Sequence, residues 1–477
     1  MATIRWRYRL TQLLVLCALT SVGHARELPS TVRSALKRAG IPGEAVGVVV
    51  QEVSSRKALF AVNQRIAFSP ASTMKLVTTD AALELLGPIF TWKTQAYVTG
   101  SVAADVLQGN LIFKGGGDPK LVTENFWLFL RQIRASGIRE IRGNVILDRS
   151  RFEPVEYDAA KFDGDPIKPH NALPDALLLN YQMLRFQFMS SVVGSTLNVA
   201  VDPPLAGYDI VAPQWTAEEC GDWQSKLGAS FGERGVRFAG GYAADCGEKT
   251  WYVHPYQMTH NQYFSAVFKK MWAEVGGRFN GEVVDGIVPE DARLLKVWES
   301  PTLPEVIRDI NKFSNNVMAR QLLLTLASTS ATDGLNLPAT AERGTQAVKA
   351  WLENKGIHAP ELLIENGSGL SRDERIAPAS MARLLLAAYK SPLMPEFISS
   401  MPLAGYDGTM RHRLTDQTVA GNAHVKTGTL KDVKALAGYV LAASGKQYVV
   451  VFFINHPAAA GGGDAQDALL EWVYVHG

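Results

Sequence analysis

Runs of consecutive apolar residues near both ends of the chain predict strands that are buried on both faces. Three such runs are 45–53 (AVGVVVQEV), 435–442 (ALAGYVLA) and 448–454 (YVVVFFI). A strand with one solvated face would instead carry polar residues at every second position. Helices are predicted over 74–86, which ends at Gly87-Pro88, and over 316–327. Strands at both ends with helices between them favour one mixed sheet assembled from N- and C-terminal parts.

The stretch between residues 91 and 299 has a different pattern. Gly, Pro and Asp turns separate short strand candidates at 110–113, 143–147, 196–201 and 281–288. We therefore expect a main domain formed by 26–90 and 300–477. Residues 91–299 are expected to form an inserted, strand-rich domain with a third domain nested inside it.

The first 25 residues have the pattern of a cleaved secretory signal. Three arginines precede a short apolar run from Leu10 to about Val22, and Gly23-His24-Ala25 supplies small residues before a cut after Ala25. The run is shorter than the roughly 20 residues that a membrane span needs, which disfavours an uncleaved anchor. We expect an exported, periplasmic protein.

Composition excludes several functional classes. The chain has 48 Lys+Arg against 46 Asp+Glu, a net charge of +2, which argues against nucleic acid as a partner. Neither the H-E-x-x-H zinc motif nor the G-x-x-x-x-G-K-[ST] phosphate motif occurs, and no metal or cofactor is expected. After a cut at Ala25 two cysteines remain, Cys220 and Cys246, and in an exported protein this pair predicts a disulfide.

Four short motifs offer a serine nucleophile. A G-x-S-x-G pentad surrounds Ser230, but that motif needs a buried strand before it, whereas 218–223 (EECGDW) is polar. Among three S-x-x-K tetrads, Ser72–Lys75 opens the predicted helix 74–86. Residues i and i+3 share a helix face, so Lys75 can reach Ser72, and apolar neighbours favour a neutral lysine that accepts a proton. Of the other two tetrads, Ser34–Lys37 is expected on a solvated helix face and Ser54–Lys57 in a turn.

Two further triplets follow in order, and each occurs once. Ser314-Asn315-Asn316 precedes the predicted helix 316–327, and Lys426-Thr427-Gly428 precedes a predicted strand pair. The small Gly428 would let a substrate lie along a strand edge, where Lys426 supplies positive charge for a carboxylate. Taken singly, the first triplet could be a helix N-cap and Lys426 a solvated strand residue. The occurrence of all three motifs in this order is a stronger indication of function than any one of them alone.

This ordered set resembles the penicilloyl-serine transferase superfamily. The chain is similar to class C low-molecular-mass penicillin-binding proteins, which are D-alanyl-D-alanine carboxypeptidases and endopeptidases. The gap of about 240 residues between Ser72 and Ser314 matches the large insertion of that group. Other family-like stretches are 69–78 (SPASTMKLVT), 115–121 (GGGDPKL), 143–148 (GNVILD), 366–372 (NGSGLSR), 402–413 (PLAGYDGTMRHR) and 425–429 (VKTGT). The family often has Asp where Asn366 stands, and 366–369 is interpreted as a structural turn.

The resemblance implies an α+β multidomain fold: a transpeptidase-like α/β/α sandwich with a central antiparallel sheet and a large strand-rich insertion. It implies that Ser72 is the nucleophile and that Lys75 takes its proton. Ser314 would relay a proton to the leaving amine, and Asn316 would hold the substrate amide and contact Lys75. Lys426 would shape the proton network and attract the terminal carboxylate.

The remaining implied contacts involve backbone groups and weaker side-chain candidates. The N–H groups of Ser72 and Thr429 would form the oxyanion hole. The other expected substrate contacts are Thr427, Gly428, Arg372 and Asp407.

The resemblance therefore predicts a serine-type D-Ala-D-Ala carboxypeptidase, DD-endopeptidase or both, acting on peptidoglycan stem peptides or cross-links. β-Lactam antibiotics would acylate it. Three alternatives stay open: a β-lactamase-like hydrolase, a non-catalytic peptidoglycan-binding protein that keeps the fold, and an esterase using Ser230. The C-terminal stretch 465–475 either packs on the core, which we favour, or touches a membrane surface.

Overall fold

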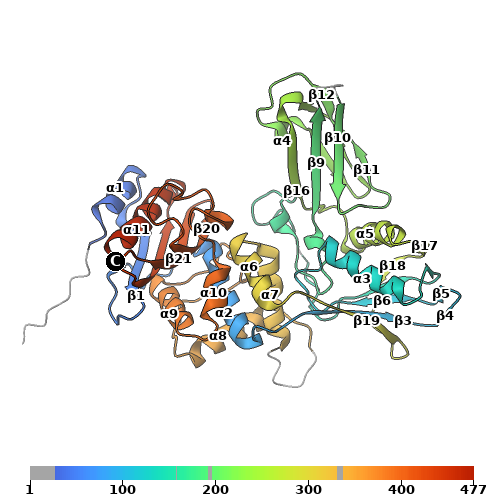
Figure 1. The fold of residues 1–477 in the computed structure, drawn as a ribbon, viewed down its shortest axis with the longest axis horizontal. Coiled ribbons are helices and arrows are strands. Elements are labelled where there is room, and N and C mark those ends of the chain that lie inside the picture. Colours follow the sequence, from blue (N-terminus) through green and yellow to red (C-terminus); the bar gives the residue numbers. More distant parts are fainter. Residues whose placement is uncertain (1–26, 157, 192–195, 330–336) are drawn as a thin grey trace, which may run out of the picture.

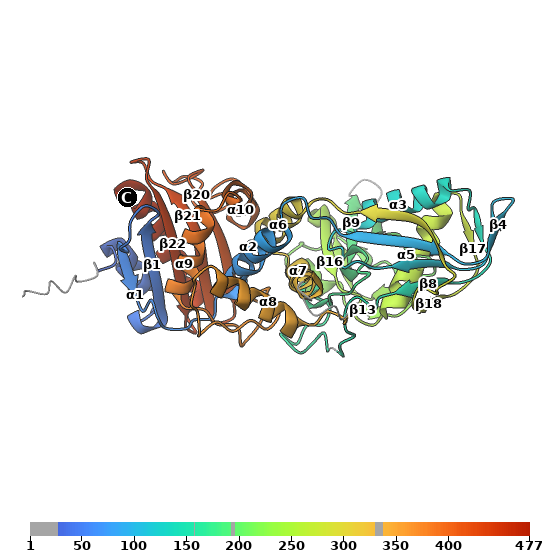
Figure 2. The same cartoon turned by 90° about the horizontal axis from the view of Figure 1, so that it is seen from below.

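The computed structural model describes residues 27–156, 158–191, 196–329 and 337–477. The predicted signal segment, 1–25, lies outside the described residues. One body of the molecule is built around an antiparallel sheet with the strand order β2-β1-β22-β21-β20 (Figures 1 and 2). Its strands come from both ends of the chain: β1 (Val46–Glu52), β2 (Phe60–Val62), β20 (Ala423–Leu430), β21 (Val433–Leu441) and β22 (Gln447–Asn455).

Both faces of this sheet are buried, as its continuous apolar runs require. Alternate residues of β22 from Val449 to Phe453 face one helical layer, and those from Val450 to Ile454 face the other. The first layer comprises α2 (Met74–Leu86), α6 (Leu303–Lys312), α7 (Asn316–Thr329), α8 (Ala341–Asn354), α9 (Pro378–Tyr389) and α10 (Met394–Ser400). The second comprises α1 (Ser30–Arg38) and α11 (Gly463–His476). The predicted α/β/α sandwich is confirmed.

The C-terminal helix α11 belongs to the core of the second layer. Leu469, Leu470 and Val473 are fully buried among residues of α1 and the sheet. Of the two interpretations of this stretch, packing is therefore correct. In the described ranges, no helix is long and apolar enough to cross a membrane.

Between α2 and α6 the chain forms a second body with its own core (Figure 2). Its strands form a five-stranded sheet, β18-β8-β6-β3-β19, and a four-stranded sheet, β17-β7-β5-β4. The bounds are β3 (Lys93–Val98), β4 (Ser101–Ala103), β5 (Val106–Gln108), β6 (Leu111–Lys114), β7 (Glu140–Ile141), β8 (Val145–Asp148), β17 (Arg278–Phe279), β18 (Val283–Asp285) and β19 (Arg293–Glu299). The strands expected near 110–113, 143–147 and 281–288 correspond to β6, β8 and β18.

Two long helices in this body were missed by the strand-rich expectation: α3 (Thr123–Ala135) and α5 (His260–Glu274). Both present aromatic side chains to the ring of Phe113 on β6, with ring centroids 5.6 to 5.9 Å apart. The apolar positions of α3, from Phe126 to Ile133, follow the 3.6-residue helical period. The Gly- and Pro-rich surroundings of these segments hid that period.

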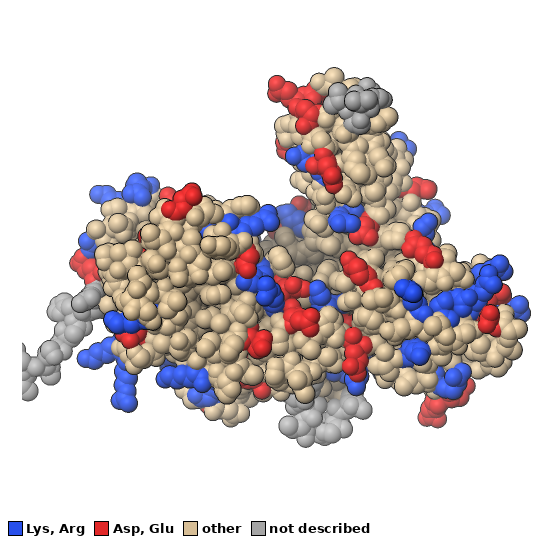
Figure 3. Space-filling view, in the orientation of Figure 1, with Lys and Arg blue, Asp and Glu red and all other residues tan. Residues whose placement is uncertain are grey.

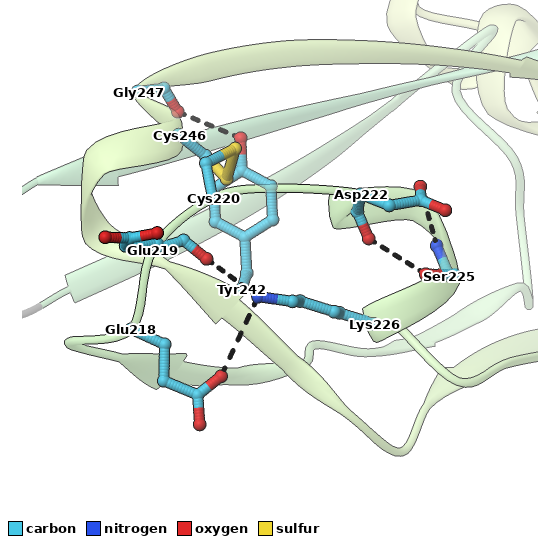
Figure 4. The surroundings of a disulfide bond; sticks show 9 residues. All are labelled: Glu218, Glu219, Cys220, Asp222, Ser225, Lys226, Tyr242, Cys246 and Gly247. Carbon is cyan, nitrogen blue, oxygen red and sulfur yellow. Dashed lines mark hydrogen bonds and ion pairs between the residues drawn. A yellow bond between two sulfur atoms is a disulfide. The ribbon is translucent and has the colours of Figure 1, made fainter.

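A smaller module projects from the second body (Figure 1). The longest strands in its sheets are β9 (Leu184–Ser191), β10 (Thr196–Asp202) and β16 (Glu248–Val253). The short elements are α4 (Trp223–Lys226), β11 (Asp209–Val211), β12 (Gln214–Thr216), β13 (Ala229–Gly232), β14 (Gly235–Phe238) and β15 (Gly241–Ala243). A disulfide joins Cys220 to Cys246 (Figure 4).

Helix α7 connects the two bodies. The Gln321 side chain donates to the carbonyl oxygens of Gly117 (3.2 Å) and Asp175 (2.9 Å) and accepts from the backbone N–H of Asp175 (2.9 Å). The Lys120 ammonium also pairs with Asp309 of α6 at 2.5 Å.

Basic and acidic side chains are interspersed over the face shown in Figure 3, which is hollowed between the first body and the projecting module.

Because the disulfide bridges a sequence separation of 26 residues, its loss is expected to destabilise the projecting module. Replacing both cysteines (Cys220→Ser, Cys246→Ser) should lower the free energy of unfolding by about 3 kcal/mol. Denaturant unfolding of the oxidised wild type and the double variant measures this difference. A double variant as stable as the oxidised wild type would contradict the prediction.

Candidate active site

Ser72 lies in a single turn of 3-10 helix, Ala71–Thr73, that leads directly into α2. The segment before it is fixed to the end of β22. Asn455 accepts from the Ser69 N–H (2.7 Å) and donates to the Ser69 carbonyl (3.1 Å). Ala71 has a φ of 43°, a strained value for a residue with a Cβ. Ser72 itself is partly exposed to solvent.

The side-chain nitrogen of Lys75 lies within hydrogen-bond distance of three oxygen atoms. It lies 3.0 Å from Ser72 Oγ, 2.5 Å from Asn316 Oδ1 and 2.5 Å from the backbone carbonyl of Ser368. The Asn316 and Ser368 oxygens are carbonyl acceptors with no proton to give. An ammonium would donate to all three oxygens, whereas a neutral amine would donate to the two carbonyls and turn its lone pair to the Ser72 hydroxyl.

Burial favours the neutral form of Lys75, whose side chain is completely inaccessible to solvent. Desolvation lowers the pKa of Lys75 well below its ordinary value, and the nearby charges of Lys426 and Arg320 lower it further. Glu374 acts in the opposite direction. Lys75 is therefore suited to accept a proton from Ser72.

The S-x-N triplet forms the connection between α6 and α7. Ser314 has a φ of 57°, and the side chain of Asn315 accepts from the N–H of Met318 (3.0 Å) at the start of α7. The N-cap interpretation therefore holds for the middle residue. Of the other two residues, Asn316 Oδ1 accepts a hydrogen bond from Lys75 Nζ, and Ser314 Oγ accepts one from Lys426 Nζ at 2.9 Å.

The K-T-G triplet lies on β20 at the edge of the sheet. Lys426 is fully buried, which lowers its pKa to about 7. In the part of the chain that the structure describes, β20 pairs with β21, and on its other side an isolated bridge joins His424 to Leu403, which leaves 426–430 as an edge without a partner strand. A Cβ on Gly428 would lie 2.8 Å from the Ser72 nitrogen, so only glycine permits this approach of β20 to Ser72. An extended peptide could add to the free edge, as peptides do at other exposed sheet edges.

Sequence reasoning missed the role of the segment 366–369. Its Ser368 carbonyl is one of the two that hold Lys75, and a backbone oxygen leaves no side-chain signature in a sequence. The segment is fixed to α2 because Thr78 Oγ1 donates to the Gly367 carbonyl (2.7 Å). Gly369, at a φ of 80°, packs where a Cβ would overlap the Ala71 carbonyl. Glu374, also missed, is completely buried behind it.

Of the weaker site candidates, Arg372 and Asp407 have different surroundings. Arg372 is exposed, and its guanidinium lies 4.8 Å from the ring centroid of Phe162 in the inserted part of the chain. Both carboxylate oxygens of Asp407 are engaged, one by Lys312 Nζ (2.6 Å) and one by the Leu403 N–H (2.8 Å). Burial alone would raise the pKa of Asp407, but these partners bring it below its ordinary value. Asp407 therefore holds its loop in place.

The competing serines lack these surroundings. Ser230 lies on the short strand β13, which turns into β14, so the strand-to-helix elbow is absent there. Ser34 and Lys37 are exposed on α1, and Ser54 is in a turn.

The two threonines expected at the substrate lie on β20. Thr427 Oγ1 lies 2.8 Å from Thr409 Oγ1, and Thr429 is exposed at the free edge of β20.

An antiparallel sheet between helical layers, with its edge strand beside a serine that contacts a buried lysine, defines a penicilloyl-serine transferase. The chain belongs to the D-Ala-D-Ala carboxypeptidase 3 (S13) family, whose profile matches residues 28–474. The predicted family and enzyme class, a serine-type D-Ala-D-Ala carboxypeptidase, are confirmed.

Relatives and solved structures agree with this assignment. The D-alanyl-D-alanine carboxypeptidase DacB of Haemophilus influenzae is 27% identical over 431 residues, covering 87% of this chain and 86% of the relative. The D-alanyl-D-alanine carboxypeptidase of Actinomadura sp. (strain R39) is 27% identical over 447 residues, covering 89% and 80%. The crystal structure of penicillin binding protein 4 (dacB) from Haemophilus influenzae superposes with a TM-score of 0.76 at 25% identity, covering 93% of this chain and 99% of that one.

The close approach of Gly428 to Ser72 gives a test of the site geometry. A Gly428→Ala variant should acylate with benzylpenicillin about a hundredfold more slowly than the wild type, because displacement of β20 or Ser72 misplaces the nucleophile. Gly463→Ala is the matched control, since the nearest atom to its Cβ would be 4.0 Å away. The rate of adduct formation, followed by intact mass, measures both. A Gly428→Ala protein that acylates at the wild-type rate would contradict the geometry.

Proposed function

We propose that this carboxypeptidase removes the terminal D-alanine from peptidoglycan stem peptides after export, through an acyl-enzyme on Ser72. The observation that carries the proposal is the position of the buried Lys75 amine, which contacts Ser72 Oγ and two carbonyl oxygens. That arrangement supports proton acceptance by lysine and nucleophilic attack by serine.

In the acylation step, Ser72 Oγ attacks the carbonyl carbon between two D-alanines and its proton passes to Lys75. The peptide carbonyl oxygen becomes the oxyanion, which the backbone N–H groups of Ser72 and Thr429 stabilise. Asn316 keeps the Lys75 amine oriented and holds the substrate amide.

Collapse of the tetrahedral intermediate breaks the peptide bond, and the leaving amine needs a proton. The Ser314 hydroxyl, which lies 2.9 Å from Lys426 Nζ, relays the proton that Lys75 took from Ser72 to this amine, so Lys75 is neutral again. Lys426 also attracts the terminal carboxylate of the substrate. Water then attacks the acyl carbon and gives a proton to neutral Lys75; as the bond between this carbon and Ser72 Oγ breaks, Lys75 returns that proton to Ser72 Oγ and the resting enzyme is restored.

We propose that the substrate lies in an extended conformation against β20, with Thr427 and Gly428 along its backbone and Arg372 beside its side chains. The edge position of β20 and the exposed guanidinium of Arg372 support this arrangement. β-Lactams would acylate Ser72 in the same way. The Haemophilus influenzae penicillin binding protein 4, 24% identical in that structure, was solved in complex with a β-lactam.

Export rests on the sequence of residues 1–25, whose removal we propose occurs near Ala25. The disulfide between Cys220 and Cys246 supports an oxidising compartment such as the periplasm.

Cleavage of cross-links breaks the same type of bond as removal of the terminal D-alanine, and the experiment below separates the two activities.

The experiment compares the mature wild type with Ser72→Ala. Incubation with benzylpenicillin should add one antibiotic mass to the wild type and none to the variant. On peptides, the wild type should release D-alanine from a D-Ala-D-Ala terminus and leave a D-Ala-L-Ala terminus intact.

Purified cross-linked dimers of stem peptides complete the test, because cleavage to monomers would add endopeptidase activity. An adduct that persists in Ser72→Ala would overturn the nucleophile assignment, and Ser230→Ala then tests the esterase alternative. Rapid turnover of the penicilloyl-enzyme without D-alanine release would favour the β-lactamase-like alternative. A folded wild type with neither activity would favour a binding protein.

A further inference from the structure

A buried carboxylate lies behind the segment that supports Lys75. Glu374 is 1% exposed and follows the turn 365–369 between α8 and α9. Its Oε1 atom accepts hydrogen bonds from three consecutive backbone N–H groups: Glu365 (3.1 Å), Asn366 (2.9 Å) and Gly367 (2.8 Å). Successive N–H groups directed at one oxygen form a site that favours an anion.

The turn held by Glu374 presents the Ser368 carbonyl to Lys75. Asn366 stiffens it, because its Oδ1 accepts from both the N–H (2.9 Å) and the hydroxyl (2.6 Å) of Ser368, and its amide donates to the Leu370 carbonyl (2.9 Å). A displacement of the 365–367 backbone would therefore move the Ser368 oxygen. The position of one of the two carbonyl partners of Lys75 depends on Glu374.

The charge of Glu374 also acts on Lys75. Charged groups from three elements influence this amine: Lys426 of β20 and Arg320 of α7 lower its pKa, and Glu374 raises it. Burial raises the pKa of Glu374 above its ordinary value, and its three N–H partners and Lys75 offset only part of that rise. Among the described residues, its second oxygen, Oε2, has no hydrogen-bond partner, so hydrogen bonds leave part of the carboxylate charge uncompensated.

We propose that Glu374 is a positioning residue for acylation: it fixes the Ser368 carbonyl on Lys75, and its negative charge stabilises the ammonium formed when Lys75 takes the proton of Ser72. This inference rests on the proposed function, in which Lys75 is the base. Without Glu374 the new ammonium would lie between the charges of Lys426 and Arg320 with no carboxylate to offset them.

The direct test is the pH dependence of acylation by a fluorescent penicillin in Glu374→Gln. Gln keeps an Oε1 acceptor for the three N–H groups and removes the charge. Acylation needs neutral Lys75, so the rate is lost as pH falls through the pKa of Lys75. Removal of a charge that raises this pKa should move the acid limb to lower pH by about one unit. The weaker base should lower the plateau rate about three- to tenfold.

Glu361→Gln is the matched control. The Glu361 carboxylate also accepts a backbone N–H, from Ala377 at 3.1 Å, and the Ser380 hydroxyl at 2.5 Å, but it is not among the groups that act on Lys75. Its pH profile and plateau should match the wild type. Glu374→Asp keeps the charge at a shorter reach, so its acid limb should stay at the wild-type pH while its plateau falls.

The outcomes separate the two proposals. An acid limb and a plateau rate equal to those of the wild type in Glu374→Gln would overturn the inference. A lowered plateau rate with an unshifted acid limb would also overturn it, because that result indicates a structural role alone. If Glu374→Gln does not fold, Glu374→Asp decides: a wild-type plateau, or a limb shifted to lower pH, overturns the inference. Wild-type acylation by Lys75→Met would instead overturn the proposed function.

Discussion

The active site depends on one amine that is kept out of water. A lysine inside a protein loses the hydration that stabilises its charge, so burial favours the neutral form. Lys75 is in that position, with two carbonyl oxygens as acceptors and a serine hydroxyl at 3.0 Å. In the proposed mechanism Ser72 requires no separate histidine, because burial favours the neutral Lys75 amine and the two fixed acceptors orient it toward the Ser72 hydroxyl.

The rest of the fold serves to bring those acceptors together. Asn316 comes from the start of α7 and the Ser368 carbonyl from the turn between α8 and α9, while Lys75 itself lies on α2. The three segments meet because the same helical layer packs on one face of the sheet. The amide pair between Asn455 and Ser69 fixes the serine turn to the sheet, and Gly428 lets the edge strand approach it. The inserted body is joined to this arrangement through Gln321 on α7, so the insertion and the site share one helix.

Much of this could be predicted from the sequence, and the exceptions have physical causes. The apolar runs predicted the strands of the central sheet, because short continuous apolar runs fit strands that are buried on both faces. The ordered motifs predicted Ser72, Lys75 and Lys426 as site residues, because the chemistry of a side chain follows from its residue type. In the structure Lys75 contacts Ser72, and Lys426 contacts Ser314. The Ser368 carbonyl could not be found this way, because a backbone oxygen is the same in every residue. Glu374 acts through hydrogen bonds that only the folded chain creates, so nothing in the sequence distinguished it from a surface acid. Asp407 was expected at the substrate, and its engagement by Lys312 and the Leu403 N–H likewise depends on the folded chain.

The most direct test of this account is the titration of Lys75 itself. Lysine labelled with carbon-13 at Cε reports the protonation of each amine by NMR, and a Lys75→Met variant identifies the signal. The account predicts that Lys75 in the folded, unacylated protein loses its proton at a pH well below the ordinary value of 10.5. A Lys75 signal that titrates near 10.5 would show a charged lysine in the resting site and contradict the central claim.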